Sequence, residues 1–181
     1  MRNELNFWVV GGDMRQAKLA ELLAGDGHTV HTFGLDIPLP DVDRADGLTG
    51  IALADCVVLP LPAAGEGAML NAPLSTASHP LAEVLDALRP GQLVCAGMVG
   101  KSLKKMAAER NLVLRDYFAR EELAVLNAIP TAEGAIQIAM EELPITLHDA
   151  RVLVVGFGRL GRALAPRLRA LGARVGVSAR R

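Results

Sequence analysis

Aromatic residues and cysteines are scarce in this chain of 181 residues. Phe, Trp and Tyr together make up 3% of it, so the core must be built from Leu, Val, Ile and Ala. The two cysteines, Cys56 and Cys95, stand apart in apolar runs, and two such residues provide no disulfide framework. We expect both to be buried free thiols.

An excess of charge is also missing. The chain has 19 basic and 20 acidic residues, a net charge of −1 and no long block of like charge. Nothing in this balance favours nucleic acid or an anionic membrane as a partner. No stretch of 18 apolar residues without charges predicts a membrane span, and the N-terminus has no signal-peptide pattern. We expect a cytoplasmic protein that handles a small molecule. No spacing of the four histidines predicts a metal site.

Short apolar runs alternate with amphipathic segments, which is the pattern of βαβ units and a parallel sheet. The predicted strands are Asn6–Val10, Thr29–Phe33, Cys56–Leu59, Leu93–Ala96, Leu112–Leu114, Arg151–Val155 and Arg174–Val177. The predicted helices are Arg15–Ala24, Pro80–Leu88, Leu103–Asn111, Glu121–Asn127, Thr131–Glu142 and Gly161–Leu171. The segment 34–50, which carries Pro, Gly and Asp without a period, predicts a loop.

Five predicted strands precede residue 116, enough for an α/β domain over residues 1–129. Residues 130–150 are interpreted as a connecting helix and linker. Residues 151–181 provide one βαβ unit, whereas a Rossmann domain needs two βαβαβ halves. The predicted fold is therefore α/β, with a flavodoxin/Rossmann-like parallel-sheet substrate domain followed by the first βαβ unit of an incomplete Rossmann domain.

The two strand–turn–helix starts resemble each other when shifted by 145 residues. Identical residues then coincide at Val9, Val10, Gly11, Leu19, Ala20, Leu23, Gly27 and Val30 of the first copy. Units of this kind share such spacing generally, so the match alone does not decide between a repeat and a common geometry.

A full G-x-G-x-x-G motif opens the second copy, at Gly156, Gly158 and Gly161. The first glycine permits a tight turn, the second lets the backbone approach a pyrophosphate, and the third permits close packing of helix on strand. We expect this turn, including Phe157 and the pair Arg159 and Leu160, to bind a dinucleotide.

The first copy has Asp13 and Gln16 where the second has Gly158 and Gly161. A carboxylate at the phosphate position would repel an anion from the helix N-terminus. We therefore expect the first unit to have the nucleotide fold without the nucleotide site. Asp13 can equally serve as the N-cap of the helix that follows.

The end of the second strand of the motif decides between NAD and NADP. NAD sites place an Asp or Glu there, about 20 residues after the first glycine, to bind the ribose hydroxyls. This chain has Ser178, followed by Arg180 and Arg181. A missing acid with guanidinium groups nearby favours a 2′-phosphate, so the cofactor is predicted to be NADP (NADPH).

Several segments together resemble the dipicolinate synthase A subunit. They are "VVGGDMRQ", "LPLPAAGEG" with "LNAPLS", "CAGMVG", "REELAVLNAIPTAEGAIQIAM" and "VLVVGFGRLGRALA", in this order. The resemblance spans the whole chain but covers only the N-terminal part of the family, whose members continue past the second Rossmann strand.

The resemblance implies a substrate domain joined by a helix to an NADP-binding domain, in a cytoplasmic enzyme of sporulating bacteria. It implies oxidation of a dihydro- or hydroxytetrahydro-dipicolinate to pyridine-2,6-dicarboxylate, a small dicarboxylate, together with a partner, the dipicolinate synthase B subunit. We also expect a homo-oligomer. Alternatives are a 2-hydroxyacid-dehydrogenase-like enzyme and a non-catalytic binding or assembly module.

The candidate substrate-binding residues follow strands or border helices. Gly12, Asp13 and Arg15 follow the first strand, where Arg15 could bind a carboxylate or simply be solvated. Glu66 lies in a loop of a kind that commonly lines a cleft.

Three further candidates belong to the "NAIPTAEG" segment, namely Asn127, Thr131 and Glu133. Thr131 fits a helix cap as well as a ligand donor. Glu133 is the candidate catalytic acid or base.

Because the predicted cofactor domain is incomplete, we expect this chain alone to show weak or no dehydrogenase activity. An NADPH turnover assay on the isolated chain checks this, and measurable turnover would contradict it.

Overall fold

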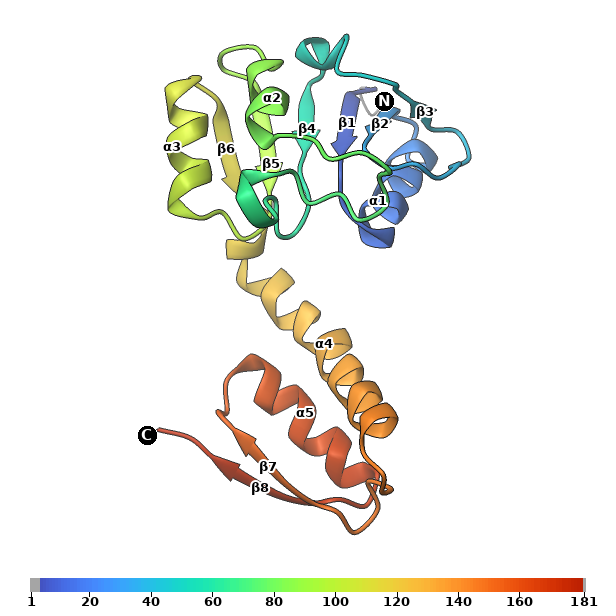
Figure 1. The fold of residues 1–181 in the computed structure, drawn as a ribbon, viewed down its shortest axis with the longest axis vertical. Helices are drawn as coiled ribbons and strands as arrows, with labels where there is room; N and C mark the ends of the chain where they lie inside the picture. Colours follow the sequence, from blue (N-terminus) through green and yellow to red (C-terminus); the bar gives the residue numbers. More distant parts are fainter. Residues whose placement is uncertain (1–3, 181) are drawn as a thin grey trace. The chain divides into compact units, whose positions relative to one another are not determined.

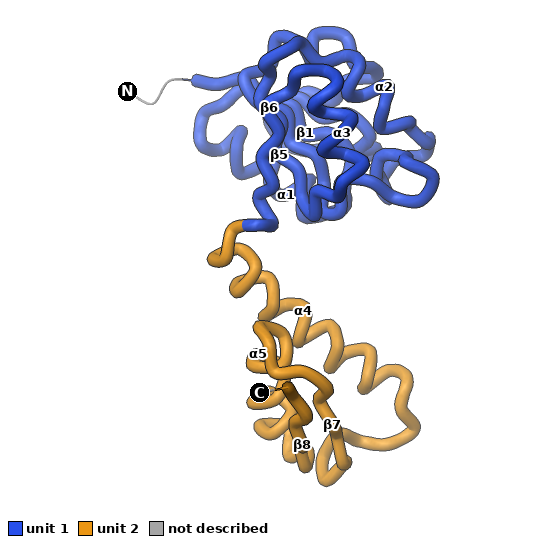
Figure 2. Tube along the Cα trace, turned by 90° about the vertical axis from the view of Figure 1, so that its left-hand side faces the viewer, with its two compact units in different colours: residues 1–119 blue, residues 120–181 orange. Residues whose placement is uncertain are grey.

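The computed structural model describes residues 4–180 and divides into two compact units, residues 1–119 and 120–181 (Figure 2). The division falls just before a long helix. Each unit is built around its own hydrophobic cluster, and each is described by itself.

The first unit is a parallel sheet in the order β3-β2-β1-β4-β5-β6 (Figure 1). Its strands are β1 (Asn6–Val10), β2 (Thr29–Phe33), β3 (Asp43–Arg44), β4 (Cys56–Val58), β5 (Leu93–Ala96) and β6 (Val113–Asp116). Each neighbouring pair is parallel. The predicted α/β class is confirmed. The order of the strands reverses at β1, because β2 and β3 lie on one side of it and β4, β5 and β6 on the other. The carboxyl ends of β1 and β4 therefore form the switch point where ligands bind in such sheets.

The two-residue strand β3 corrects the prediction of a loop over residues 34–50. Asp43 and Arg44 pair with His31 and Thr32 of β2. So short a strand at a sheet edge carries no hydrophobic alternation, and the sequence pattern therefore missed it. Without β3 the order would be that of flavodoxin, and with it the order is that of the Rossmann fold.

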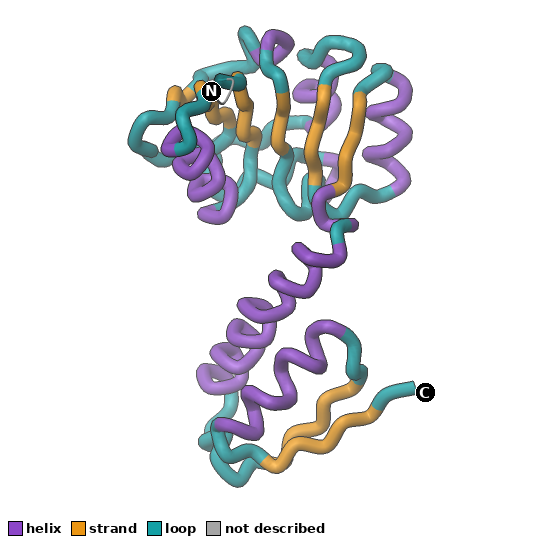
Figure 3. The backbone as a smooth tube through the Cα atoms, turned by 180° about the vertical axis from the view of Figure 1, so that it is seen from behind, coloured by secondary structure: helices purple, strands orange, loops and turns teal. Residues whose placement is uncertain are grey.

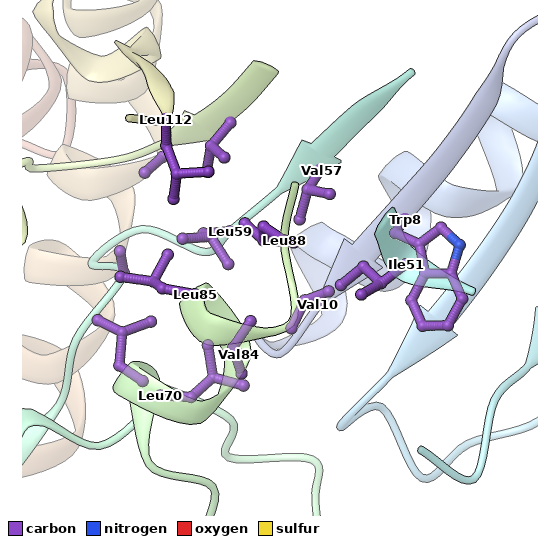
Figure 4. Close-up of a cluster of buried hydrophobic side chains, with 14 of the residues drawn as sticks. Trp8, Val10, Ile51, Val57, Leu59, Leu70, Val84, Leu85, Leu88 and Leu112 are labelled. Carbon is purple, nitrogen blue, oxygen red and sulfur yellow. The ribbon is translucent and has the colours of Figure 1, made fainter. Parts of the chain in front are cut away.

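Helices cover both faces of this sheet (Figure 3). They are α1 (Met14–Gly25), α2 (Leu81–Asp86) and α3 (Lys101–Glu109), with short 3-10 helices η1 (Ile51–Leu53), η2 (Glu66–Ala68) and η3 (Tyr117–Ala119). Val9 and Val30 pack with Ala20 of α1. Val10 and Val57 point to the opposite face, into the larger cluster with α2 and α3 (Figure 4). Alternate residues of each strand thus supply two cores.

The two cysteines lie on the neighbouring strands β4 and β5 as free thiols with their Sγ atoms 3.8 Å apart. Cys56 is buried as expected, whereas Cys95 is only half-buried. The hydrogen bond from the Cys56 thiol lowers the pKa of Cys95.

The second unit consists of α4 (Glu121–Glu142), β7 (Arg151–Val155), α5 (Arg159–Ala170) and β8 (Arg174–Ser178) (Figure 1). β7 and β8 form a parallel two-stranded sheet. Its core is the cluster of Leu147, Val154, Leu168 and Ala173, against which Ile136 and Ala139 of α4 pack.

Helix α4 replaces two predicted helices. The sequence predicted a break at Pro130, but one helix of 22 residues contains this proline. A proline removes one helical hydrogen bond, and burial of Ala128 and Ala132 on either side of it favours continuity. Thr131 therefore does not cap a helix start: its Oγ1 donates to the carbonyl of Asn127, one turn earlier, at 2.7 Å.

By length and composition alone, α4 is apolar enough to cross a membrane, and within residues 4–180 it is the one helix that meets this criterion. Its Ile136 and Ala139 face the core of the second unit. Other apolar side chains of the same helix, among them Leu126, Ile138 and Met140, are exposed.

Candidate functional site

The two βαβ halves are structural repeats of each other. After the shift of 145 residues, β1, α1 and β2 have the same bounds as β7, α5 and β8. In the first copy the N–H of Gly11 donates to the carbonyl of Phe33 at 2.8 Å, and in the second the N–H of Gly156 donates to Ser178 at 2.7 Å. Positions in the two turns can therefore be compared one to one.

The three glycines of the second copy have the geometry that a dinucleotide turn requires. Gly156 has a φ of +103° and makes the turn. A Cβ added to Gly158 would meet nothing within 4 Å, so this backbone is open to a close approach. A Cβ on Gly161 would lie 2.3 Å from the carbonyl oxygen of Gly156, so only glycine lets the helix sit this close to the turn.

The N-terminus of α5 presents free N–H groups at this turn. Gly158 is the N-cap and supplies no side-chain acceptor. The N–H of Arg162 makes the first intrahelical bond, to Gly158 at 2.9 Å, which leaves the N–H groups of the three residues before it facing outward. Together with the helix dipole, these groups form an anion site.

Residues 156–160 of the turn are exposed, and Gly161 is buried. The guanidinium of Arg162 lies 5.9 Å from the centre of the Phe157 ring. Arg159 forms a two-pronged ion pair with Glu121 of α4, which holds the pKa of that carboxyl below its ordinary value. The Arg159 charge is therefore already paired, whereas Leu160 can offer a ligand only its backbone N–H group.

The end of β8 lies beside the glycine turn. Ser178 pairs with Val155, and its carbonyl accepts the N–H of Gly156. Ser178 and Arg180 are both exposed. Among the described residues 178–180 this strand end has no carboxylate, and Arg181 lies outside the described residues.

In the first copy the equivalent turn is occupied by its own side chains. Asp13 is the N-cap of α1, and its Oδ1 accepts the N–H of Arg15 at 2.9 Å, which confirms the capping role. The Arg15 guanidinium also binds the Asp13 carboxylate, through Nη2 at 2.8 Å, and keeps the pKa of Asp13 below its usual value. The same Nη2 donates to the carbonyl of Leu61, after β4, at 2.9 Å.

Gln16 fills the remaining space at this turn. Its side chain is buried and donates to the carbonyl of Leu59 at 3.2 Å. A Cβ on Gly12 would lie 2.1 Å from the Gln16 Cγ, so glycine is required for this packing. Where the second copy is open at Gly158, the first has an anionic cap and a buried amide.

The remaining predicted site residues lie elsewhere. Glu66 is exposed in η2. Asn127, Thr131 and Glu133 belong to α4 in the second unit, whereas Gly12, Asp13 and Arg15 belong to the first. The Glu133 carboxylate lies 3.7 Å from the Arg167 guanidinium of α5.

Tyr117 and Asp36, near the carboxyl ends of β1, β2 and β4, were missed by sequence reasoning, whereas Asn71 belongs to the loop of Glu66 that the sequence offered as a cleft lining. Tyr117 donates its hydroxyl to the carbonyl of Leu59 at 3.1 Å, and burial raises its pKa to about 12. Asn71 and Asp36 bind the loop 61–79 to the sheet. The signal for Asp36 was present, because it follows the second strand, where dinucleotide folds carry an acid. Over residues 4–180 no cluster of His, Cys, Asp or Glu is arranged to hold a metal ion.

Comparison with known proteins now adds the family. The family model described as the N-terminal domain of the dipicolinate synthase A subunit matches residues 6–118. The chain belongs to the dipicolinate synthase A subunit family. The dipicolinate synthase A subunit of Bacillus subtilis (strain 168) is 30% identical to it over 191 aligned residues, covering 99% of this chain and 62% of that protein.

Solved structures agree with this assignment. The crystal structure of the dipicolinate synthase A subunit from Bacillus halodurans is 28% identical with a TM-score of 0.84, over 99% of this chain and 64% of that one. The Bacillus subtilis structure is 28% identical with a TM-score of 0.79, over 100% of this chain and 62% of that one. A transhydrogenase from Sinorhizobium meliloti, 18% identical with a TM-score of 0.63 over 97% of this chain and 57% of that one, shares the fold. The chain thus spans under two thirds of the length of these family members.

We predict that Gly161→Ala destabilises the second unit by about 1–3 kcal/mol, because the added methyl would overlap the Gly156 carbonyl. Gly134→Ala on α4, where a Cβ meets nothing within 4 Å, is the matched control and should be neutral or slightly stabilising. Urea unfolding followed by amide NMR signals of residues 151–180 measures both. Fluorescence would not report this unit, because Trp8 and Tyr117 lie in the first. Equal stability of the two variants would contradict the packing argument.

Proposed function

We propose that this chain is the NADP-linked oxidoreductase subunit of a dipicolinate synthase. It would act on a dihydro- or hydroxytetrahydro-dipicolinate and form pyridine-2,6-dicarboxylate. The observation that carries the proposal is the contrast between two equivalent turns. The turn at Gly158 is open over a helix N-terminus, and the turn at Asp13 is closed by its own side chains. One repeat is thus suited to a dinucleotide and the other is free for a substrate.

The residues of the second unit fit an NADP pyrophosphate. The open backbone at Gly158 and the outward N–H groups of the first turn of α5 would hold it. A bound nicotinamide supplies the hydride acceptor for oxidation of the ring. Ser178 and Arg180 support the choice of NADP, because a guanidinium can bind a 2′-phosphate where NAD sites carry an acid.

The first unit would hold the dicarboxylate at the carboxyl end of β1. Arg15 is fixed there by Asp13 and by the Leu61 carbonyl, with more than half of its side chain exposed. Gly12 and Glu66 are the other candidates of this unit. Aromatisation of a dihydro ring removes one hydride, to the nicotinamide, and one proton, so a base must accept the proton; a hydroxytetrahydro ring must lose one water as well. Glu133 is our candidate base, and Asn127 and Thr131 are candidate substrate contacts on the same helix.

The relatives are named as one subunit of a synthase, which supports a multi-subunit enzyme. We propose that the partner is the dipicolinate synthase B subunit, that this chain forms a homo-oligomer, and that it has a cytoplasmic role in spore formation. The apolar side chains exposed on α4, such as Leu126, Ile129 and Met140, supply surface for such contacts.

The cofactor assignment predicts a specific pattern of binding losses. Gly158→Ala should abolish binding of NADP and NAD alike, because its methyl blocks the phosphate approach without disturbing the fold. Arg180→Ala should weaken NADP about tenfold or more and leave NAD unchanged. Isothermal titration with NADP, NAD and NADPH measures this. Arg174→Ala is the matched control, because Arg174 is an exposed arginine at the start of β8 that pairs with Asp149. Unchanged NADP affinity in Gly158→Ala would refute the cofactor site.

The substrate assignment is tested separately with pyridine-2,6-dicarboxylate as the probe. Arg15→Ala should weaken its binding about tenfold, because a charge-assisted contact to a carboxylate is lost. Lys18→Ala removes an exposed cation from the same helix, where it pairs with Glu21, and should bind as the wild type does. NMR titration of the first unit's amides reads out both variants. Equal affinity of Arg15→Ala and wild type would remove Arg15 from the site.

A further inference from the structure

The first unit contains a loop that lies across the turn equivalent to the dinucleotide turn. The N–H of Gly12, which corresponds to that of Phe157, donates to the carbonyl of Asn71 at 2.7 Å. Leu70 is buried against Gly11, where its Cγ would lie 2.8 Å from an added Cβ. A backbone carbonyl of the same chain thus accepts the N–H of the residue before the N-cap of α1, and the Leu70 side chain fills the space beside Gly11.

The same loop is held at its other end by Asp36, just after β2. The Asp36 carboxylate accepts the N–H of Thr76 at 2.7 Å and the Thr76 hydroxyl at 2.9 Å. The hydroxyl of Ser75 donates to it at 3.3 Å. These bonds, the Thr76 N–H first among them, keep the pKa of Asp36 below its ordinary value, so the carboxylate is ionised at neutral pH.

The position of Asp36 after β2 allows its hydroxyl partners to be compared with those of the acid in dinucleotide folds. In dinucleotide folds an acid at the end of the second strand accepts hydrogen bonds from the ribose hydroxyls. Here Asp36, three residues beyond the end of β2, accepts two hydroxyl groups, and both belong to the protein. Arg44, with its Nη2 3.6 Å from Asp36, adds a cation to the same cluster. The polar pocket beside it, about 170 Å³, is lined by His79 and Asp46 as well.

We infer that residues 70–76 are an internal occupant of the nucleotide-type crevice of the first unit, and that Asp36 is the residue that positions them. The Asn71 carbonyl accepts the N–H of Gly12 after β1, and the Ser75 and Thr76 hydroxyls bind the acid that follows β2, so the loop itself occupies the end of the sheet where a dinucleotide would lie. The loop begins at Leu61, whose carbonyl holds Arg15. Docking of the loop therefore closes the first unit to nucleotides. It also fixes the position of the Leu61 carbonyl that binds Arg15, whichever substrate that unit takes.

Amide hydrogen exchange on the full chain tests this inference at one atom. Asp36→Ala should raise the exchange rate of the Gly12 N–H by about tenfold or more, because the loop that carries its acceptor loses a charged anchor. Cleavage after Glu66 by a glutamate-specific protease should accelerate in parallel. Asp46→Ala is the control: its carboxylate lines the same pocket, and no bond from it to the loop is seen among the described residues.

A second variant keeps the test decisive if Asp36→Ala does not fold. Ser75→Ala combined with Thr76→Val removes both hydroxyls and keeps the carboxylate. It should raise the Gly12 exchange rate by about threefold, with circular dichroism unchanged. Wild-type exchange at Gly12 in either folded variant would overturn the inference. An equal acceleration in Asp46→Ala would also overturn it, since the effect would then come from surface charge. Neither readout involves NADP or dicarboxylate binding, so failure here is distinct from failure of the proposed function.

Discussion

Backbone N–H groups at the start of a helix need acceptors, and in this chain the way they are satisfied distinguishes two otherwise equivalent units. In the first, the Asp13 carboxylate accepts the N–H of Arg15 in the first turn of α1, and the Asn71 carbonyl accepts the N–H of Gly12 in the turn just before the helix. In the second, Gly158 provides no side-chain acceptor at the same place. The first helix start therefore has a side-chain cap from the protein, and the second has capacity left for an anion from outside.

Charge reinforces this division. The Asp13 carboxylate stays ionised beside Arg15, and a pyrophosphate lying over the backbone of that turn would meet both this negative cap and the Gln16 side chain. Arg15 cannot offset this freely, because two of its nitrogens already bind Asp13 and one of these also binds the Leu61 carbonyl. A ligand of the first unit must use what Arg15 still exposes. A planar carboxylate needs fewer free donors than a pyrophosphate, and for this reason we assign the dicarboxylate to the first unit.

The sequence was informative wherever local physics dominated. Apolar runs of β-formers located β1, β2 and β7 with their full bounds, because each buries alternate residues against a helix. The interpretation of Gly161 as a close-packing glycine also agrees with the geometry, since a contact within one βαβ unit depends on spacing alone. The failures came from tertiary context. Pro130 predicted a break, but burial of the small residues around it keeps α4 continuous, and β3 exists only because an edge of β2 was available to pair with.

The missed contacts of the site have a different cause. Asn71 and Thr76 act through bonds to Gly12 and Asp36, residues far away in the sequence, and no periodic pattern encodes such pairs. Asp36 could still have drawn attention as an acid shortly after the second strand of the copy that lacks the glycines. Its carboxylate would seem misplaced in a unit without a nucleotide until its partners are seen to be hydroxyls of the same chain. Polar groups at the end of a sheet need partners, and the loop of residues 70–76 supplies them from within the chain: an oxygen for the N–H of Gly12 and hydroxyls for the Asp36 carboxylate.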